Sequence, residues 1–125
     1  MILLYVALGS ALGGVSRYLL GGFLQLRADT AFPIGTLVVN VSGSFLMGFF
    51  ARYAMETSDF SPLARAFLTA GFCGGYTTFS TFSYESFQLL EQGSYGKAAT
   101  YMLSSLLVAL AATVVGVLAA RQMVE

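Results

Sequence analysis

The 125-residue sequence contains no histidine and only one cysteine, Cys73. Without histidine, the commonest general acid–base group and the commonest metal ligand are both missing. A single cysteine excludes an internal disulfide and a metal site built from several thiolates. Serine and threonine are frequent, but no obvious base stands beside them to activate a hydroxyl as a nucleophile. The sequence therefore does not indicate an enzyme, and we expect no catalytic residues.

The sequence also contains few charged residues. Six Lys and Arg balance six Asp and Glu, and together they make up 10% of the chain, whereas soluble domains typically carry about 25%. Hydrophobic residues make up 57%, and the mean hydropathy is +0.77. A neutral chain with so few cations offers no basic face for nucleic acid, and its apolar composition excludes a disordered chain. We therefore expect a membrane protein surrounded by a lipid bilayer.

The few charged residues leave four long apolar stretches between them. Since a bilayer-spanning helix needs about 20 mostly apolar residues, these stretches predict four transmembrane helices at about 2–23, 34–54, 62–90 and 96–121. Polar clusters at 25–30, 56–59 and 91–94 are expected to form the connecting loops. The predicted fold is an all-α membrane protein, with residues 1–125 forming a single four-helix transmembrane domain.

The third predicted helix is longer than a bilayer requires, and it contains three glycines between positions 71 and 75. Ser61 and Pro62 suit its N-cap and its first helical position. A break in this helix near Gly74–Thr77 explains both its length and its glycines. Because lipid cannot satisfy the backbone groups that such a break frees, we expect them to face protein or a polar cavity.

The positive charges divide equally between the two sides of the membrane. With four spans, both termini lie on one side together with Arg52, Arg65 and Arg121. The other side carries Arg27 and Lys97, and also Arg17 if it lies in the last turn or two of the first helix. The positive-inside rule then gives almost no preferred orientation. Two copies inserted in opposite directions would form an antiparallel, dual-topology homodimer. A weak orientation bias is the alternative, because moving one arginine changes the count.

Polar residues inside apolar helices need partners and indicate either helix contacts or an ion pathway. In the second helix, Thr36, Asn40 and Ser44 are spaced by four and share one face. The Asn40 amide suits a hydrogen bond between helices or a polar pathway, and the residues alone leave both open. Hydroxyl groups in the fourth helix lie at Tyr101, Ser105 and Thr113. These hydroxyls either continue a polar pathway or form hydrogen bonds to the backbone of their own helix.

A second polar cluster follows the expected break. Phe79 and Phe82 share one face at i, i+3, and Ser80 and Ser83 share a neighbouring face. Phenylalanines at this spacing commonly pack in a core or against lipid, which is the alternative to a functional role. Hydroxyls are neutral hydrogen-bond donors, and the edges of aromatic rings carry partial positive charge. Such a surface would solvate a small anion without a fixed positive charge.

Arg17 and Glu85 are the ionisable residues expected to lie deepest in the membrane. Either they pair with each other, or Arg17 extends beside a vestibule that contains Glu85. Gly9 and Gly13 form a GxxxG pattern, which indicates close helix packing within the chain or between chains. Cys73 is expected to be a small buried apolar residue.

Three motifs carry a resemblance to a known family. The longest reads GFCGGYTTFSTFSYE over 71–85, the second reads GTLVVNVSGSF over 35–45, and the third, weaker one reads GGVSRY over 13–18. Together they resemble the signatures of the Fluc (CrcB) fluoride channels of microbial membranes. The resemblance extends over nearly the whole chain.

The resemblance implies a dual-topology homodimer with two pores and a central structural sodium ion (Na+). Matched residue by residue, the implied fluoride pore is lined by Asn40, Phe79, Phe82, Ser80, Ser83, Tyr101 and Ser105, with Thr113 as a further candidate. The backbone carbonyls of Gly74 and Thr77 match the sodium site, and oxygen ligands suit a hard cation. Ala109 stands where some members carry a hydroxyl, so the polar track of the fourth helix has a gap.

The expected function is passive, fluoride-selective export across the cell inner membrane, which lowers cytoplasmic fluoride and gives fluoride resistance. A neutral, narrow lining would replace the hydration shell of fluoride and disfavour the larger chloride. A small proton-coupled exporter is one alternative, but it needs a membrane-embedded carboxylate, usually in the first helix. The first helix here has none, and the only candidate is Glu85, far along the third helix. A scaffold without transport activity is the other; it explains the small-residue packing but not the clustered hydroxyls and phenylalanines.

Overall fold

The computed structural model describes residues 1–125, and all of its regular structure is helical. The elements are α1 (Ile2–Ala28), α2 (Ile34–Glu56), α3 (Pro62–Ala66), the π-helix η1 (Phe67–Cys73), α4 (Gly74–Tyr76), α5 (Phe79–Glu91) and α6 (Tyr95–Val124). Three of them, α1, α2 and α6, are long and apolar enough to cross a membrane. The prediction of an all-helical fold with membrane-spanning helices is therefore confirmed.

The first loop differs from the prediction. Residues 25–28 were expected to be loop because they are polar, but α1 continues to Ala28 and ends where Asp29 adopts a left-handed conformation. The Gln25 side chain explains the difference. Its Nε2 donates to the carbonyls of Thr30 (2.8 Å) and Phe32 (3.0 Å), and its Oε1 accepts from the Gly35 amide (3.1 Å). Gln25 thus holds the α1–α2 turn from a position inside the helix.

The third predicted helix is broken, as expected. Its first part starts at the predicted cap, since the Ala64 amide donates to Ser61 Oγ (3.1 Å), and it runs through α3, η1 and α4 to Tyr76. Thr77 and Thr78 are then extended, before α5 starts at Phe79. Gly74 is still helical, so the break begins at the C-terminal edge of the predicted segment.

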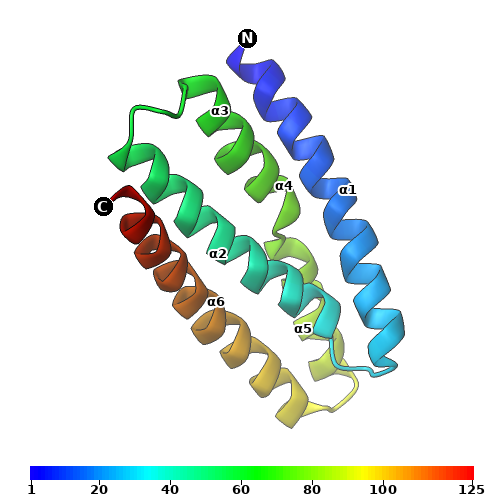
Figure 1. The fold of residues 1–125 in the computed structure, drawn as a ribbon. Coiled ribbons are helices and arrows are strands. Elements are labelled where there is room, and N and C mark those ends of the chain that lie inside the picture. The colour runs from blue at the N-terminus through cyan, green and yellow to red at the C-terminus, as the bar shows by residue number, and fades with distance from the viewer.

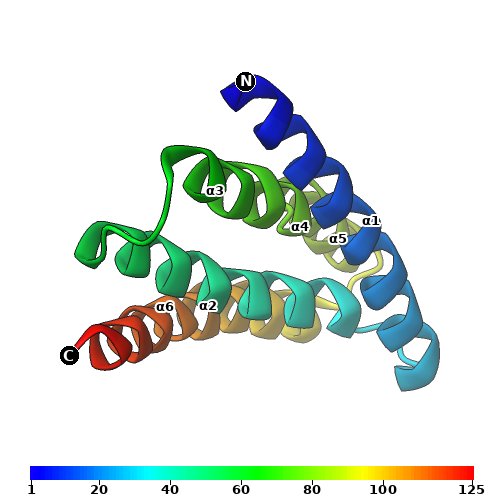
Figure 2. The same ribbon diagram turned by 45° about the horizontal axis from the view of Figure 1, so that its top comes forward.

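The helices pack in two groups (Figures 1 and 2). In both views α2 runs beside α6, and α1 lies against the segment formed by α3, η1 and α4. Both termini lie at the same end of the bundle as the α2–α3 loop (Figure 1). Glycines allow the close approach of backbones. A Cβ at Gly13 would collide with the Phe72 carbonyl oxygen, and one at Gly48 with the Thr113 carbonyl oxygen. The GxxxG of α1 therefore serves packing within the chain.

Few side chains are enclosed by the protein itself. Only 16 of 125 residues are buried, and Leu, Val, Phe and Met side chains are exposed along α1 and α6. Soluble monomers rarely expose so much apolar surface to water, whereas the acyl chains of a lipid bilayer would cover it. The small enclosed cluster of Leu89, Ala98 and Tyr101 lies between α5 and α6, next to the polar residues described below.

Candidate functional site

Asn40 pairs with both backbone groups of Thr78 at the helix break. Asn40 Oδ1 accepts from the Thr78 amide (2.8 Å), and its Nδ2 donates to the Thr78 carbonyl (3.0 Å). In a continuous helix, the Thr78 amide would bond to the Gly74 carbonyl instead. One side chain of α2 thereby satisfies groups that lipid could not. Of the two interpretations that the sequence leaves open for Asn40, helix-to-helix hydrogen bonding is present.

A cavity of about 460 Å³ opens beside this pair, and we call it the Asn40 cavity. Five predicted pore residues line it: Asn40, Phe79, Phe82, Ser105 and Thr113. Cys73, fully buried as expected, also lines it. No Lys, Arg, Asp or Glu is among the lining residues. Helices α2, α5 and α6 and the break thus bring together neutral donors and aromatic rings from distant parts of the sequence.

The hydroxyls that α6 contributes to the Asn40 cavity differ in their hydrogen bonding. Thr113 Oγ1 donates to the Ala109 carbonyl (3.1 Å) and lies 3.3 Å from the Ser44 carbonyl oxygen, so it bonds to backbone. Ser105 Oγ is the one buried side-chain oxygen or nitrogen without a hydrogen-bond partner. Ala109 lines the cavity between them. Ser105 is therefore the hydroxyl of α6 in this cavity that has no hydrogen-bond partner within the protein.

Ser80 and Ser83 lie elsewhere. Both are exposed on the outer face of α5, and neither lines the Asn40 cavity. Phe79 lies beside them and is 78% exposed, although it also lines the cavity. Within one protomer, the predicted pore residues of α5 therefore divide between an inner surface and an outer one.

Tyr101 is fully buried and faces Glu85. Its hydroxyl donates to Glu85 Oε1 (3.0 Å). Its ring contacts Phe82, with ring centroids 5.2 Å apart, and Phe82 in turn contacts Phe79 at 5.7 Å. The three aromatic rings thus form a continuous series between the outer face of α5 and the Glu85 carboxylate.

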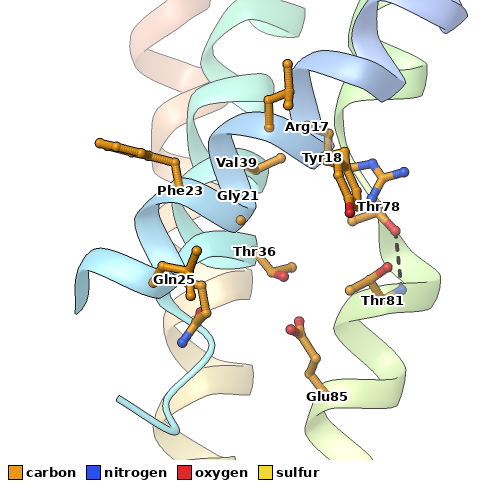
Figure 3. Close-up of a pocket in the computed structure, with 13 residues that line it drawn as sticks. Arg17, Tyr18, Gly21, Phe23, Gln25, Thr36, Val39, Thr78, Thr81 and Glu85 are labelled. Carbon is orange, nitrogen blue, oxygen red and sulfur yellow. Dashed lines mark hydrogen bonds between the residues drawn. The ribbon is translucent and has the colours of Figure 1, made fainter. Parts of the chain in front are cut away.

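A second cavity, of about 480 Å³, lies between α1, α2 and α5, and we call it the Arg17 cavity. Figure 3 shows Thr36, Thr81 and Glu85 pointing into this space from two sides. Arg17 also lines it, but Arg17 Nε donates to the Gly75 carbonyl (3.4 Å) and forms no ion pair with Glu85. The mutual Arg17–Glu85 pair considered from the sequence is therefore absent, and both charges border one cavity.

The break also leaves carbonyl oxygens without partners. The Thr77 carbonyl accepts no hydrogen bond, and no side chain donates to the Gly74 carbonyl. Gly74 is exposed on the protomer. No cluster of His, Cys, Asp and Glu exists that would bind a divalent metal ion. Carbonyl oxygens alone suit a hard monovalent cation, so the donor set fits the expected sodium ion.

Several residues of this site were not singled out from the sequence. Thr78 lines both cavities, and Thr81 lines the Arg17 cavity. The sequence pattern also does not predict the hydrogen bond between Tyr101 and Glu85, which lie 16 residues apart on different helices. Spacing was a usable signal for Thr78, Thr81 and Glu85, because they follow one another at intervals of three and four along one helical face.

The fold and the site define a multi-pass helical membrane protein with two cavities that border a helix break and share Thr78. The family described as "CrcB-like protein, Camphor Resistance (CrcB)" matches residues 4–117. The chain belongs to the CrcB family. It is accordingly a transport protein and not an enzyme.

The similar proteins of established name agree with one another. One from Geobacter sulfurreducens is 48% identical over 121 residues, which cover 97% of this chain and 98% of that protein. One from Rhizobium meliloti is 46% identical over 122 residues, which cover 98% of both chains. Both are named "Fluoride-specific ion channel FluC". The family description refers to a resistance, whereas the names of these relatives state an ion.

Proposed function

We propose that this protein is a fluoride-selective channel that lets fluoride leave the cell passively across the inner membrane, which lowers cytoplasmic fluoride and gives fluoride resistance. The observation that carries this proposal is the lining of the Asn40 cavity. The Asn40 amide, the unpartnered Ser105 hydroxyl and the rings of Phe79 and Phe82 line it together. Fluoride holds its hydration water strongly, so a pore needs donors at close range to replace it.

The absence of cationic side chains from the Asn40 cavity supports selectivity. A fixed positive charge would attract chloride and fluoride alike, whereas neutral donors at short range favour the smaller anion. The sequence contains no nucleotide-binding motif, so the chain itself has no source of energy for pumping. Transport therefore follows the fluoride gradient.

The broken segment forms the fourth span of the membrane in this proposal. The first part, 62–76, and α5 (Phe79–Glu91) follow each other along the bundle in one direction (Figure 1). Neither part alone has the length of about 20 residues that a span needs, but together they do. The break then lies near the middle of the membrane, where its unpaired groups are most costly.

A second copy, inserted in the opposite direction, covers the outer face of α5. That face presents Ser80 and Ser83 beside the exposed Phe79. Hydroxyls that face lipid lose their hydrogen bonds, so a partner protein surface stabilises them. Arg17 bonds to Gly75 beside the break, so three positive charges lie on the side of the termini and two on the other. An excess of one charge gives only a weak orientation bias, which permits both orientations. A two-fold axis repeats the site, which gives two pores per dimer.

The same axis accounts for a structural sodium ion. The carbonyl of Thr77 has no partner, and Gly74 is exposed, so two copies would contribute two pairs of carbonyls to one cation. A buried cation favours nearby anions electrostatically. Arg17 has a related role in the neighbouring cavity, where its charge attracts anions while Glu85 is held by Tyr101. Exchanging sodium for choline is expected to reduce the thermal stability of the dimer.

Fluoride efflux from liposomes tests the proposal. Purified protein is reconstituted into liposomes loaded with potassium fluoride, and the released fluoride is read with an electrode, with potassium chloride as the parallel control. Rapid fluoride release with negligible chloride release is expected. Equal release of both ions would remove selectivity, and no release from folded protein would favour the scaffold or exporter alternatives.

The topology is tested separately with a protease-sensitive tag at the C-terminus of the protein in native membrane vesicles. A dual-topology dimer leaves about half of the tags accessible from each side. Tags on one side only would reject dual topology without touching the fluoride proposal.

A further inference from the structure

Beyond Glu85, α5 continues to present polar side chains on its inner face. Thr78, Thr81, Glu85, Gln88 and Gln92 follow one another at intervals of three and four residues, from the N-cap to the C-cap of α5, which places them in one stripe along the helix. This stripe is distinct from the outer face of Phe79, Ser80 and Ser83. It begins at the break and ends at the α5–α6 turn, where the chain reaches the end of the bundle opposite to both termini (Figure 1).

Three cavities border this stripe in sequence. The Asn40 cavity and the Arg17 cavity share Thr78. The Arg17 cavity shares Gln25 and Glu85 with a third one, of about 180 Å³, which we call the Gln88 cavity. Four of the seven residues that line the Gln88 cavity are polar: Gln25, Glu85, Gln88 and Gln92. Polar side chains that line cavities therefore continue along the stripe beyond Glu85.

The three glutamines of the Gln88 cavity differ in whether their side-chain amides are already hydrogen-bonded. The Gln25 amide is fully used, because both of its N–H groups and its oxygen bond to the α1–α2 turn. Neither Gln88 nor Gln92 forms a side-chain hydrogen bond. Gln88 is half-buried, and Gln92 is exposed. A free neutral amide at a half-buried position provides the same donor chemistry as Asn40.

We infer that Gln88, with Gln92 outside it, forms the mouth through which a small hydrated anion passes between the Glu85 end of the conduit and water. This inference rests on the proposed fluoride function and adds the last segment of the route. The amide N–H groups bind the anion as it loses or regains its water, next to a carboxylate that would otherwise repel it. Gln25 shapes the wall of the mouth by fixing the turn, and it donates nothing to the ion.

Fluoride efflux from liposomes containing Gln88→Met, Gln88→Glu and Gln88→Lys proteins tests the inference. Met keeps the length of the side chain and removes the donor, so flux should fall about three- to ten-fold, as expected for one lost hydrogen bond. Gln88→Glu should reduce flux further, because it adds a second negative charge beside Glu85. The fluoride flux of the Gln88→Lys protein should be higher than that of the Gln88→Met protein. Gln122→Met, an exposed glutamine of α6 that lines none of the three cavities, is the matched control.

A charge added after folding covers the case in which a substitution impairs folding. In the Gln88→Cys protein, anionic and cationic methanethiosulfonate reagents are compared in assembled liposomes. Wild-type protein is the control, because it keeps Cys73, which lines the Asn40 cavity, and so measures any effect of the reagents at that thiol. Loss of flux with the anionic reagent, and less loss with the cationic one, is expected. If Gln88→Glu, Gln88→Lys and both modified proteins conduct within two-fold of wild type, as an order-of-magnitude criterion, the mouth lies elsewhere. Absence of flux in wild type would instead reject the fluoride function itself.

Discussion

The hydroxyl of Tyr101 donates a hydrogen bond of 3.0 Å to Glu85 Oε1, and this links α6 to α5 below the helix break. Tyr101 is fully buried, and Glu85 borders the Arg17 and Gln88 cavities. No cation forms an ion pair with Glu85, since the one salt bridge of the chain joins Arg52 to Glu56. A neutral donor is therefore what disperses the charge of a carboxylate that stands beside the proposed anion route.

The Tyr101→Phe substitution tests this relationship. A hydrogen bond to a charged group contributes about 1.5–3 kcal/mol, so its loss leaves a more repulsive carboxylate and should reduce fluoride flux at least about ten-fold. Adding Glu85→Gln should restore much of the flux, because the repulsion is removed. Liposome efflux from the single and double variants checks this, with the exposed Tyr95→Phe as control. Equal losses in the single and double variants would show that Tyr101 acts independently of Glu85.

Asn40 should matter for both stability and conduction. Asn40→Ala leaves the Thr78 amide and carbonyl unpaired, and each unsatisfied buried group costs about 1–3 kcal/mol, so the thermal midpoint in detergent should fall. Asn40→Asp keeps an acceptor for the Thr78 amide but places a negative charge at the Asn40 cavity. It should therefore abolish most fluoride flux, because repulsion is strong at low dielectric. Normal flux in Asn40→Asp would restrict Asn40 to a structural role.

The same substitution at Phe79 and at Phe82 should have different effects on the stability of the protomer. Phe82 packs against Tyr101 and Phe79, and such aromatic pairs contribute about 0.5–1.5 kcal/mol each, so Phe82→Ile should lower protomer stability. Phe79 is 78% exposed, so Phe79→Ile should leave protomer stability nearly unchanged. Both variants should lose fluoride flux, because both lose a ring edge at the Asn40 cavity. Unfolding midpoints and efflux are measured together, and unchanged flux in both would remove the rings from the mechanism.

Helical periodicity predicted which residues share a face but not what they meet. Thr36 lines the Arg17 cavity, and Asn40 and Ser44 line the Asn40 cavity. The partner of Asn40, however, lies 38 residues away, and its backbone is available only because the helix breaks there. The glycines indicated a break near its true position. Its exact residues depend on the Asn40 contact, which a local pattern does not contain.

Two further features depend on contacts between elements. The π-helix η1 packs its backbone against Gly9 and Gly13 of α1, and nothing in its own composition distinguishes it from an α-helix. Similarly, Gln25 was assigned to a loop because it is polar, yet it lies in α1 and bonds to the turn that follows. In both cases tertiary contacts override local propensity.

Substitutions at Ala109 test whether an additional hydroxyl in α6 increases fluoride conduction. It lines the Asn40 cavity between Ser105 and Thr113, and it interrupts a row of hydroxyls spaced by four. Ala109→Thr and Ala109→Val have nearly the same shape and differ by one hydroxyl. We expect the Thr variant to conduct fluoride about three- to ten-fold faster than the Val variant, in line with one additional hydrogen bond. Equal efflux rates would place Ala109 outside the ion's path.

Adjacent glycines in α1 provide a matched test of the packing that holds the broken segment in place. A Cβ at Gly13 would collide with the Phe72 carbonyl and lie 2.9 Å from the Tyr76 amide, and both atoms belong to rigid helix backbone. A Cβ at Gly14 would meet nothing within 4 Å. Gly13→Ala should therefore destabilise the protein by about 1–3 kcal/mol, as overpacking does. Gly14→Ala should be neutral or stabilising by up to about 1 kcal/mol, because alanine has a higher helix propensity than glycine.

Thermal unfolding in detergent compares the two variants. Arg17 lies one turn further along α1 and bonds to Gly75, so fluoride efflux should fall only in Gly13→Ala. Similar midpoints for both variants would mean that α1 can move away from the π-helix without cost.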